Sequence, residues 1–302
     1  MHNNKLPNFL IAGFAKCGTT SLVNYIKNHE EIFICKEKEL RYLTYDLLKK
    51  KGYKGHGDEN VKNIAVKSLD EYKSHFNTMP QHSAIGEATA DTAYYYKHTI
   101  PKIKNILGDP KIIILLRDPV KRAISAYSHL VREERETLNF EDALNAENER
   151  LKSGFEYIWG YKQSSMYYES IRAYKENFTN VKIILFEDLI ENPNKEVKNT
   201  LSFLEVNESY QFRKTQFNRS GRPKNTYLNR FLIKKSRFKD TLKRIFGEEI
   251  TIRLKESIQK HNLEKIIVNQ DLQKKLYLEL KSDIENLENY LNIDLSHWKK
   301  YE

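Results

Sequence analysis

The chain has 302 residues, which is enough for one large domain with a substantial core. Its 51 Lys and Arg residues outnumber 41 Asp and Glu residues, so the formal net charge is +10 and favours anionic partners such as nucleic acid, phosphorylated cofactors or acidic sugars. The longest apolar run, residues 112–116, is too short to cross a bilayer, and the first residues lack the apolar stretch of a secretory signal. We therefore expect a cytoplasmic protein without a transmembrane segment.

Three short apolar runs predict buried strands, at residues 9–13, 112–116 and 182–186. Helical periodicity follows the first and second runs, and after the second it extends from Val120 to Val131. Strands that alternate with helices are typical of an α/β fold with a mostly parallel sheet. The sequence therefore predicts a central, mostly parallel sheet flanked by helices.

Two further regions are expected to belong to the same single domain, residues 1–302. Residues 44–85 are rich in Lys, Tyr and Gly without a strong period, and we interpret them as a helical insertion. Residues 228–302 are expected to form a helical C-terminal region, in which apolar residues recur at three- and four-residue steps from Leu272 to Leu291. We expect this amphipathic helix to pack on its own domain. The basic stretch at 230–260 is typical of a solvated helical face, with a membrane-surface or polyanion role as the alternative.

The stretch after the first predicted strand indicates a phosphate-binding turn. Gly13 and Gly18 allow close backbone approach, and a helix that opens with hydroxyl residues presents its N–H groups to an anion. The candidate anion-binding residues are Lys16, Cys17, Gly18, Thr19, Thr20 and Ser21. The nucleotide P-loop has its lysine after the second glycine, whereas Lys16 precedes Gly18. The motif therefore predicts a phosphate site of another kind.

A second anion clamp is predicted where the strand at 112–116 ends. Arg117 follows this strand, Pro119 suits the first turn of a helix, and Ser125 lies two turns further on. Alone, these residues are equally consistent with a salt-bridged turn. Together with the first motif they imply a ligand that carries phosphates at two separated places.

The two cysteines, Cys17 and Cys35, provide neither a disulfide framework nor metal-ligand spacing. Cys17 is either a reactive thiol beside a cationic loop or a small residue that fits the turn, and we prefer the second interpretation.

These motifs resemble the sulfotransferases that use 3′-phosphoadenosine 5′-phosphosulfate (PAPS). "GFAKCGTTSL" is similar to their loop for the 5′-phosphosulfate, and "LLRDPVKRAISAY" is similar to their clamp for the 3′-phosphate. Further segments follow in family order, namely "NHEEIFICKEKELRYL", "GEATADTAYYY", "IILFEDLIENP", "NRSGRPKN" and "DIENLENYLNIDLSHW". The resemblance is strongest to the branch of bacterial carbohydrate and heparan sulfate sulfotransferases. It implies a sulfotransferase fold like that of P-loop NTPases.

The resemblance also implies the chemistry. The donor would be PAPS, the product 3′-phosphoadenosine 5′-phosphate (PAP), and no metal would be required. Lys16 would stabilise charge on the leaving phosphate, as fixed cations do in in-line transfer. Glu39 stands at the position of the family's catalytic glutamate and would accept the acceptor proton. Glu37 would take this role if the register slips, and the remaining alternative is that both are surface charges.

Other residues are assigned to the site by the same resemblance. On the acceptor side these are Lys38, Arg41 and Glu87, although Arg41 replaces the family's histidine. Glu87 would shape the acceptor pocket or pair with Lys38. A turn at Gly221 would bring Arg222 or Lys224 to the 3′-phosphate, and Arg219 remains an alternative.

The predicted function is sulfation of a hydroxyl or amine on a carbohydrate acceptor. A small lipid, phenol or other alcohol is the alternative acceptor, and a nucleic-acid-binding protein is the non-enzymatic alternative. Basic residues are spread along the chain without a recognised nucleic-acid motif, so we expect no nucleic-acid partner.

Overall fold

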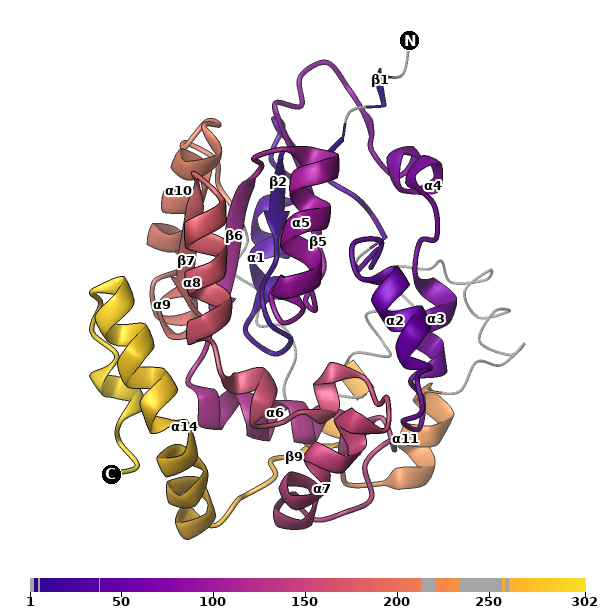
Figure 1. Ribbon diagram of the computed structural model, residues 1–302, viewed down its shortest axis with the longest axis vertical. Helices are drawn as coiled ribbons and strands as arrows, with labels where there is room; N and C mark the ends of the chain where they lie inside the picture. Colours follow the sequence, from indigo (N-terminus) through magenta and orange to yellow (C-terminus); the bar gives the residue numbers. More distant parts are fainter. Residues whose placement is uncertain (1–2, 5, 38, 213–220, 234–256, 259–260) are drawn as a thin grey trace.

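The computed structural model describes residues 3–4, 6–37, 39–212, 221–233, 257–258 and 261–302 (Figure 1). The central sheet has five strands in the order β3-β5-β2-β6-β7, and all neighbouring strands are parallel. The strands are β2 (Phe9–Ile11), β3 (Ile32–Ile34), β5 (Ala84–Ala88), β6 (Lys111–Leu116) and β7 (Val181–Leu185). The prediction of an α/β fold with a parallel sheet is confirmed.

The three strands predicted from apolar runs correspond to β2, β6 and β7. Strands β3 and β5 were missed, because the short apolar run of β3 directly follows Glu30 and Glu31, and β5 contains Gly86 and Glu87. Gly86 is nevertheless required in a central strand. A Cβ atom there would lie 2.0 Å from the ring of Phe9 on β2, so glycine lets that ring pack across β5.

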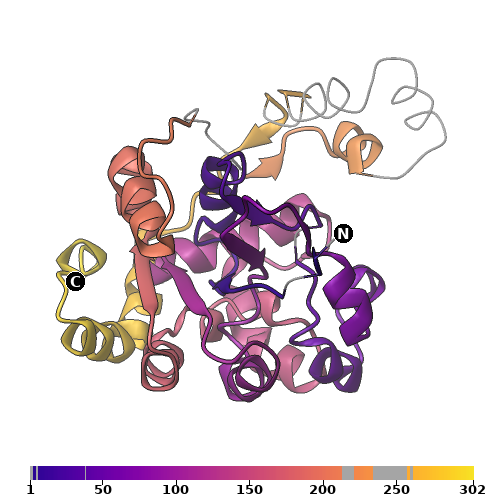
Figure 2. The same cartoon turned by 90° about the horizontal axis from the view of Figure 1, so that it is seen from above.

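Helices cover both faces of the sheet (Figure 2). Helices α1 (Thr19–Ile26) and α10 (Pro193–Leu204) pack together on one face, and α5 (Tyr96–Leu107) and α8 (Tyr168–Asn177) pack together on the other. The buried strands therefore have apolar residues on both sides, which explains the continuous run at 112–116.

The remaining elements surround this core. They are β1 (Asn3–Asn4), α2 (Tyr45–Lys51), α3 (Glu59–Ile64), α4 (Leu69–Ser74), β4 (Asn77–Thr78), α6 (Pro119–Arg132), α7 (Phe140–Lys152), η1 (Tyr157–Trp159), η2 (Gln163–Ser165), α9 (Phe186–Glu191), β8 (Arg222–Pro223), α11 (Thr226–Ile233), β9 (Leu263–Glu264), α14 (Gln270–Leu291) and η3 (Ser296–Trp298). The expected insertion at 44–85 thus contains α2, α3, α4 and β4, and its last two residues begin β5.

Helix α14 packs against α8 and α6. Its buried apolar residues Leu276, Leu280, Ile284 and Leu287 follow the three- and four-residue steps read from the sequence. Asp283 fixes the contact, because its carboxylate accepts a hydrogen bond from the backbone N–H of Tyr167 at 2.6 Å. The central part of the basic stretch, residues 234–256, lies outside the described residues.

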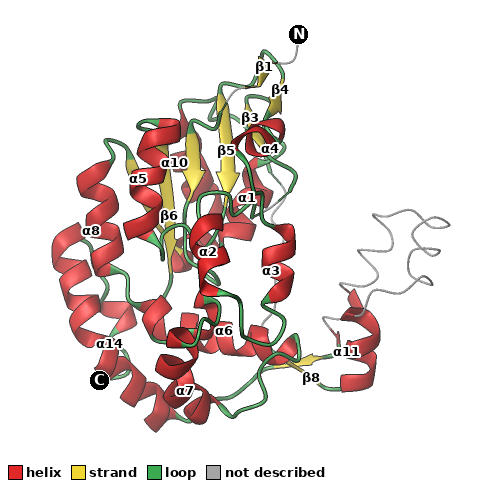
Figure 3. Cartoon of the chain, turned by 45° about the vertical axis from the view of Figure 1, so that its right-hand side comes forward, coloured by secondary structure: helices red, strands yellow, loops and turns green. Residues whose placement is uncertain are grey.

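The carboxyl ends of the strands point toward α2, α3 and α6 (Figure 3). In open parallel sheets, ligands bind at this end. Both anion-binding motifs follow strands that end there, β2 and β6.

Candidate active site

The loop between β2 and α1 presents the N-terminus of α1 without an internal cap. Gly18, the residue before the helix, has a left-handed φ of 96°, and no side chain caps the helix. The first turn contains no acidic residue. Thr19 and Thr20 occupy the first two helical positions, where backbone N–H groups have no acceptor within the helix. This end of α1 is suited to bind an anion.

Both glycines of the loop are required by close contacts. A Cβ atom at Gly13 would lie 2.9 Å from Cγ2 of Thr19, and one at Gly18 would lie 2.6 Å from the ring of Phe186. The left-handed φ of Gly18 adds a second reason for glycine. The loop is therefore packed tightly against α9, which begins at Phe186.

Arg122 of α6 holds the loop between β2 and α1 through hydrogen bonds. Its fully buried side chain donates from Nε to the carbonyl of Ala15 at 3.2 Å. Nη1 donates to the carbonyls of Gly160 at 3.2 Å and Tyr161 at 3.1 Å. The loop is thereby tied to α6 and to the segment around η1.

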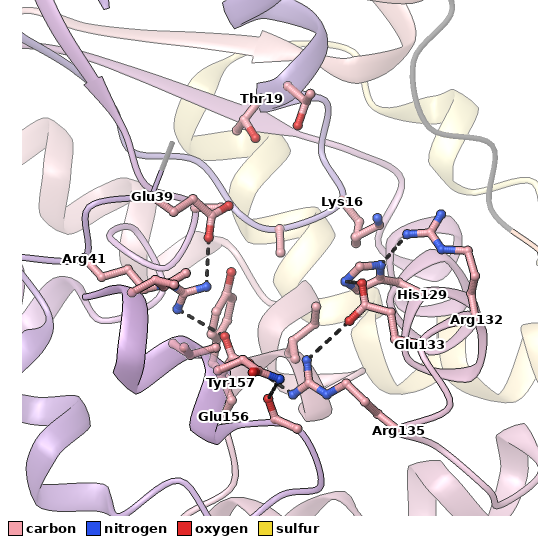
Figure 4. Close-up of a pocket in the computed structure, with 18 residues that line it drawn as sticks. Lys16, Thr19, Glu39, Arg41, His129, Arg132, Glu133, Arg135, Glu156 and Tyr157 are labelled. Carbon is pink, nitrogen blue, oxygen red and sulfur yellow. Dashed lines mark hydrogen bonds and ion pairs between the residues drawn. The ribbon is translucent and has the colours of Figure 1, made fainter. Parts of the chain in front are cut away.

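A cavity of about 1060 Å³, its open mouth included, lies beside this loop (Figure 4). Lys16, Thr19 and Thr20 line it from the loop, and Glu39 lines it from the segment after β3. Other charged residues of its described wall are Arg41, Arg132, Glu133, Arg135 and Glu156. The cavity therefore brings Lys16 and Glu39, which the sequence analysis assigned to the reaction, to one site.

Glu39 forms an ion pair with Arg41 at one side of the cavity. Nη2 of Arg41 donates to Oε2 of Glu39 at 2.8 Å, and Nη1 lies 2.8 Å from Asp91 and 3.1 Å from Glu156. Burial raises the pKa of Asp91 to about 7, although the charge of Arg41 acts in the opposite direction. The pKa of Glu156 is also raised by burial.

His129 lies on the other side of the cavity, on α6 near Lys16 (Figure 4). Burial, together with the positive charges of Lys16, Arg132 and Arg135, holds the pKa of His129 well below its usual value. The neutral ring accepts a hydrogen bond at Nδ1 from Arg132 at 2.8 Å. Its Nε2 then carries the proton and lies 3.3 Å from Glu133.

Arg135 connects the two sides of the wall. Its Nη2 donates to Glu156 at 3.3 Å and also pairs with Asp58, and its Nη1 lies 3.7 Å from Glu133. Ionic contacts consequently run along the cavity wall from Glu133 to Glu39 through Arg135, Glu156 and Arg41, which alternate in charge.

A model of the sulfotransferase family matches residues 7–210 of the chain. The chain belongs to the sulfotransferase family. It is similar along 98% of its length to all of a sulfotransferase from Alicyclobacillus acidocaldarius, with 28% sequence identity and a TM-score of 0.77. It is 34% identical over 124 residues to membrane-associated sulfotransferase kil1 from Dictyostelium discoideum. That match covers 40% of this chain and 22% of the Dictyostelium protein, so it spans less than a quarter of that relative.

These similarities confirm the resemblance to sulfotransferases and the sulfotransferase fold. Among the described residues, no helix of this sulfotransferase combines the length and apolar character that a membrane span needs.

The two candidate bases of the sulfotransferase lie in different surroundings. Glu39 lines the cavity, and 24% of its side chain is exposed. The side chain of Glu37 is 59% exposed, pairs with His75 at 3.2 Å and does not line the cavity. Geometry therefore favours Glu39 over Glu37.

The acceptor-side candidates are not gathered at one place. Arg41 lines the cavity, but its side chain is largely buried and occupied by carboxylates. Glu87 is buried away from the cavity and accepts hydrogen bonds from Tyr72 and Thr89, and burial raises its pKa. Lys38 lies outside the described residues, so its pairing with Glu87 stays a prediction.

The predicted 3′-phosphate clamp lies beside the loop. Arg117 donates from Nη1 to the carbonyl of Lys16 at 3.0 Å, and its guanidinium lies 4.5 Å from the ring centre of Phe186. Nε of Arg117 is buried without a hydrogen-bond partner among the described residues. Ser125 is buried on α6, and neither residue belongs to the described lining of the cavity.

The late basic segment of the sulfotransferase contacts α6 through β8. Gly221 is buried, and a Cβ atom there would lie 2.4 Å from the carbonyl oxygen of Glu264. Arg222 is exposed and pairs with Glu264, and Lys224 is also exposed. None of the three lines the cavity, and Arg219 lies outside the described residues, so their roles toward a 3′-phosphate stay predictions.

Several residues of the cavity wall and of the ion pairs behind it were missed in the sequence. His129 and Arg132 follow Arg122 and the predicted Ser125 at three- and four-residue steps, which places all four on one face of α6. This spacing was a usable signal, because it begins in the quoted motif and continues beyond it. Asp91, Arg135 and Glu156 offered no comparable pattern, since their contacts join segments far apart in the chain.

The environment of the two thiols favours a packing role for Cys17. Its side chain is fully buried, and burial raises its pKa to about 11. Burial also raises the pKa of Cys35. Since the thiolate is the reactive form and both side chains are buried, we expect neither to act as a nucleophile at neutral pH.

We therefore expect iodoacetamide at neutral pH to alkylate neither cysteine of the native enzyme, as checked by intact mass. Denatured protein, the control, should gain two labels. Labelling of Cys17 in the native state with loss of activity would instead identify it as the reactive thiol.

Proposed function

We propose that this sulfotransferase moves the sulfuryl group of PAPS to a hydroxyl or amine of a carbohydrate acceptor by in-line displacement. The supporting observation is the shared cavity, which Lys16 and Glu39 line from opposite sides (Figure 4). Lys16 would neutralise charge on the leaving phosphate while Glu39 takes the acceptor proton. Transfer then breaks the bond between sulfur and the bridging oxygen and forms a bond between sulfur and the acceptor atom.

The loop supports the donor side of this proposal. The uncapped N-terminus of α1 offers N–H groups to a phosphosulfate, and Lys16 extends from the same loop. Arg117, Ser125 and one of Arg222 or Lys224 are proposed to hold the 3′-phosphate. This arrangement of cations and backbone donors supplies the charge that a metal ion supplies in phosphoryl transfer, and we propose that none is needed.

The cavity wall supports a polyhydroxylated acceptor. The guanidinium of Arg135 and the carboxylate of Glu133 provide donors and acceptors for neighbouring hydroxyls of a sugar. A phenol or lipid alcohol is the second candidate, because Val61 and Ile64 of α3 give the same cavity an apolar part. Incubation with labelled PAPS and sets of oligosaccharides, glycolipids and small alcohols distinguishes them, and we expect label on the oligosaccharides.

The location of the enzyme stays a prediction. We propose a cytoplasmic protein, although the Dictyostelium relative is named membrane-associated. Fractionation of cells that express the full chain tests this point.

A donor with a 3′-phosphate should be recognised through that group. We expect PAP to raise the melting temperature much more than AMP does, because binding to the native state alone stabilises it by about 2.7 kcal/mol at 100 times Kd. Thermal unfolding with each nucleotide measures the difference.

The control is Arg117→Ala, which should remove most of the advantage of PAP over AMP. Equal shifts by both nucleotides in the unaltered enzyme would contradict the PAPS assignment, and stabilisation by ATP with Mg²⁺ alone would indicate a nucleotide kinase.

A further inference from the structure

We propose that Arg41 and Asp91 are positioning residues for Glu39. In this arrangement Asp91 fixes the guanidinium of Arg41, and Arg41 holds one oxygen of the Glu39 carboxylate so that the other faces the acceptor. The inference rests on the proposed function, in which Glu39 is the base.

The contact between Arg41 and Glu39 leaves one carboxylate oxygen for the acceptor. Arg41 donates to Oε2 at 2.8 Å, whereas Oε1 has no hydrogen bond or ion pair with the described residues. The side chain of Glu39 is 24% exposed and lines the cavity, and we infer that Oε1 is the oxygen that faces it (Figure 4). One oxygen is thus held while the other remains available for a proton.

Asp91 and Glu156 determine where the guanidinium lies. Both are buried, and both contact Nη1 of Arg41, at 2.8 Å and 3.1 Å. Asp91 is itself held by the hydroxyl of Thr44, which donates to Oδ2 at 3.1 Å. Because the guanidinium is planar, anchoring Nη1 in this way also fixes the direction in which Nη2 donates.

The backbone at Glu39 and Arg41 indicates that their geometry is imposed by these contacts. Glu39 has a φ of 66° and Arg41 a φ of 54°, in the left-handed region that residues with a Cβ atom rarely adopt. Such conformations persist only where surrounding contacts determine them. The N–H of Glu39 donates to the carbonyl of Ala88 at 3.1 Å, which adds to the ion pairs.

The guanidinium of Arg41 is shared among several carboxylates. Here Asp91 and Glu156 contact the same guanidinium, and Arg135 in turn contacts Glu156. Arg41 therefore forms ion pairs with three carboxylates, those of Glu39, Asp91 and Glu156.

The inference predicts a loss of kcat that depends on Glu39. We expect Arg41→Gln to lower kcat about 10-fold to 100-fold and Asp91→Asn about 10-fold, because small displacements of a catalytic group have effects of this size. Acceptor KM and PAP affinity should stay within about twofold, since neither residue would contact a ligand. Transfer of label from PAPS to the best acceptor, with titration calorimetry of PAP, gives these quantities.

The deciding measurement is the double variant. In a Glu39→Gln background, Arg41→Gln should change kcat less than about twofold, because Arg41 acts only through the carboxylate that is already absent. Arg41→Lys should recover part of the activity that Arg41→Gln loses. Thr44→Val removes the hydroxyl that holds Asp91 but keeps every charge and the side-chain volume, so the protein should stay folded. We expect this variant to lower kcat about twofold to fivefold.

The matched control is Arg150→Gln. Arg150 forms an ion pair with buried Glu136 at 2.5 Å but does not line the cavity, so its loss should lower the melting temperature and leave kcat unchanged. Additive losses from Arg41→Gln and Glu39→Gln, or a raised acceptor KM at normal kcat, would overturn the inference and make Arg41 an acceptor contact.

Failure of the proposed function gives a different result. The unaltered enzyme would then transfer no label from PAPS, or Glu39→Gln would keep full kcat. Either outcome removes the base and, with it, the role of its positioning residues.

Discussion

Replacement of Lys16 by alanine is expected to lower kcat by about two to three orders of magnitude, the loss typical of one preorganised donor at a site of developing charge. Lys16 lines the cavity from the loop that precedes α1. Its φ of 74° is as unfavourable for alanine as for lysine, so the substitution removes the charge without changing the backbone strain. Initial rates with saturating PAPS and acceptor measure the effect.

The control for this prediction is Lys175→Ala on α8, where the lysine is exposed and away from the cavity. Its kcat should equal that of the unaltered enzyme, and Arg117→Ala should mainly weaken donor binding. If Lys16→Ala keeps near-normal turnover, the loop contributes only to binding, and the leaving phosphate must be stabilised by other groups.

Replacement of Glu39 by glutamine should lower kcat about a hundredfold or more on an alcohol acceptor. Glutamine keeps the size and polarity of the side chain but cannot accept the proton, whereas donor affinity should stay nearly unchanged. Steady-state rates and PAP binding, measured on the same preparations, separate these two quantities. An amine or an acidic phenol needs less help from a base, and the loss should then be smaller.

Glu37→Gln is the matched control, since Glu37 comes two residues earlier and pairs with His75 outside the cavity. It should leave kcat unchanged. The reverse pair of outcomes would move the base to Glu37. Full activity of Glu39→Gln on a simple alcohol would end the assignment of Glu39.

The sequence was sufficient to predict those parts of the fold that depend on neighbouring residues. Strand β6 can be recognised in the sequence as an apolar run, because helices cover both of its sides. The loop at Gly18 can be recognised because a left-handed turn before a helix requires glycine. Strand β5 could not be recognised in the sequence. Its Gly86 leaves space for the ring of Phe9 on β2, and a contact between two distant strands produces no pattern along the chain.

The same distinction applies to the site. Lys16 and Glu39 were assigned from motifs, and the structure places both at one cavity. The pairing of Arg41 with Asp91 was not visible, because it depends on which strands of the sheet are neighbours. Strands β3 and β5 pair in parallel, and the segments that follow them carry Arg41 and Asp91 to the same place.

The ring of Phe186 also restricts how this sequence can change over generations. It fills the space where Gly18 lacks a Cβ atom, and its face lies under the guanidinium of Arg117. A lineage that gained alanine at position 18 would first have to exchange the ring for a smaller side chain. That exchange would deprive Arg117 of its aromatic support before any benefit appeared. We therefore expect positions 18, 117 and 186 to change together in related sequences, although they come from three distant parts of the chain.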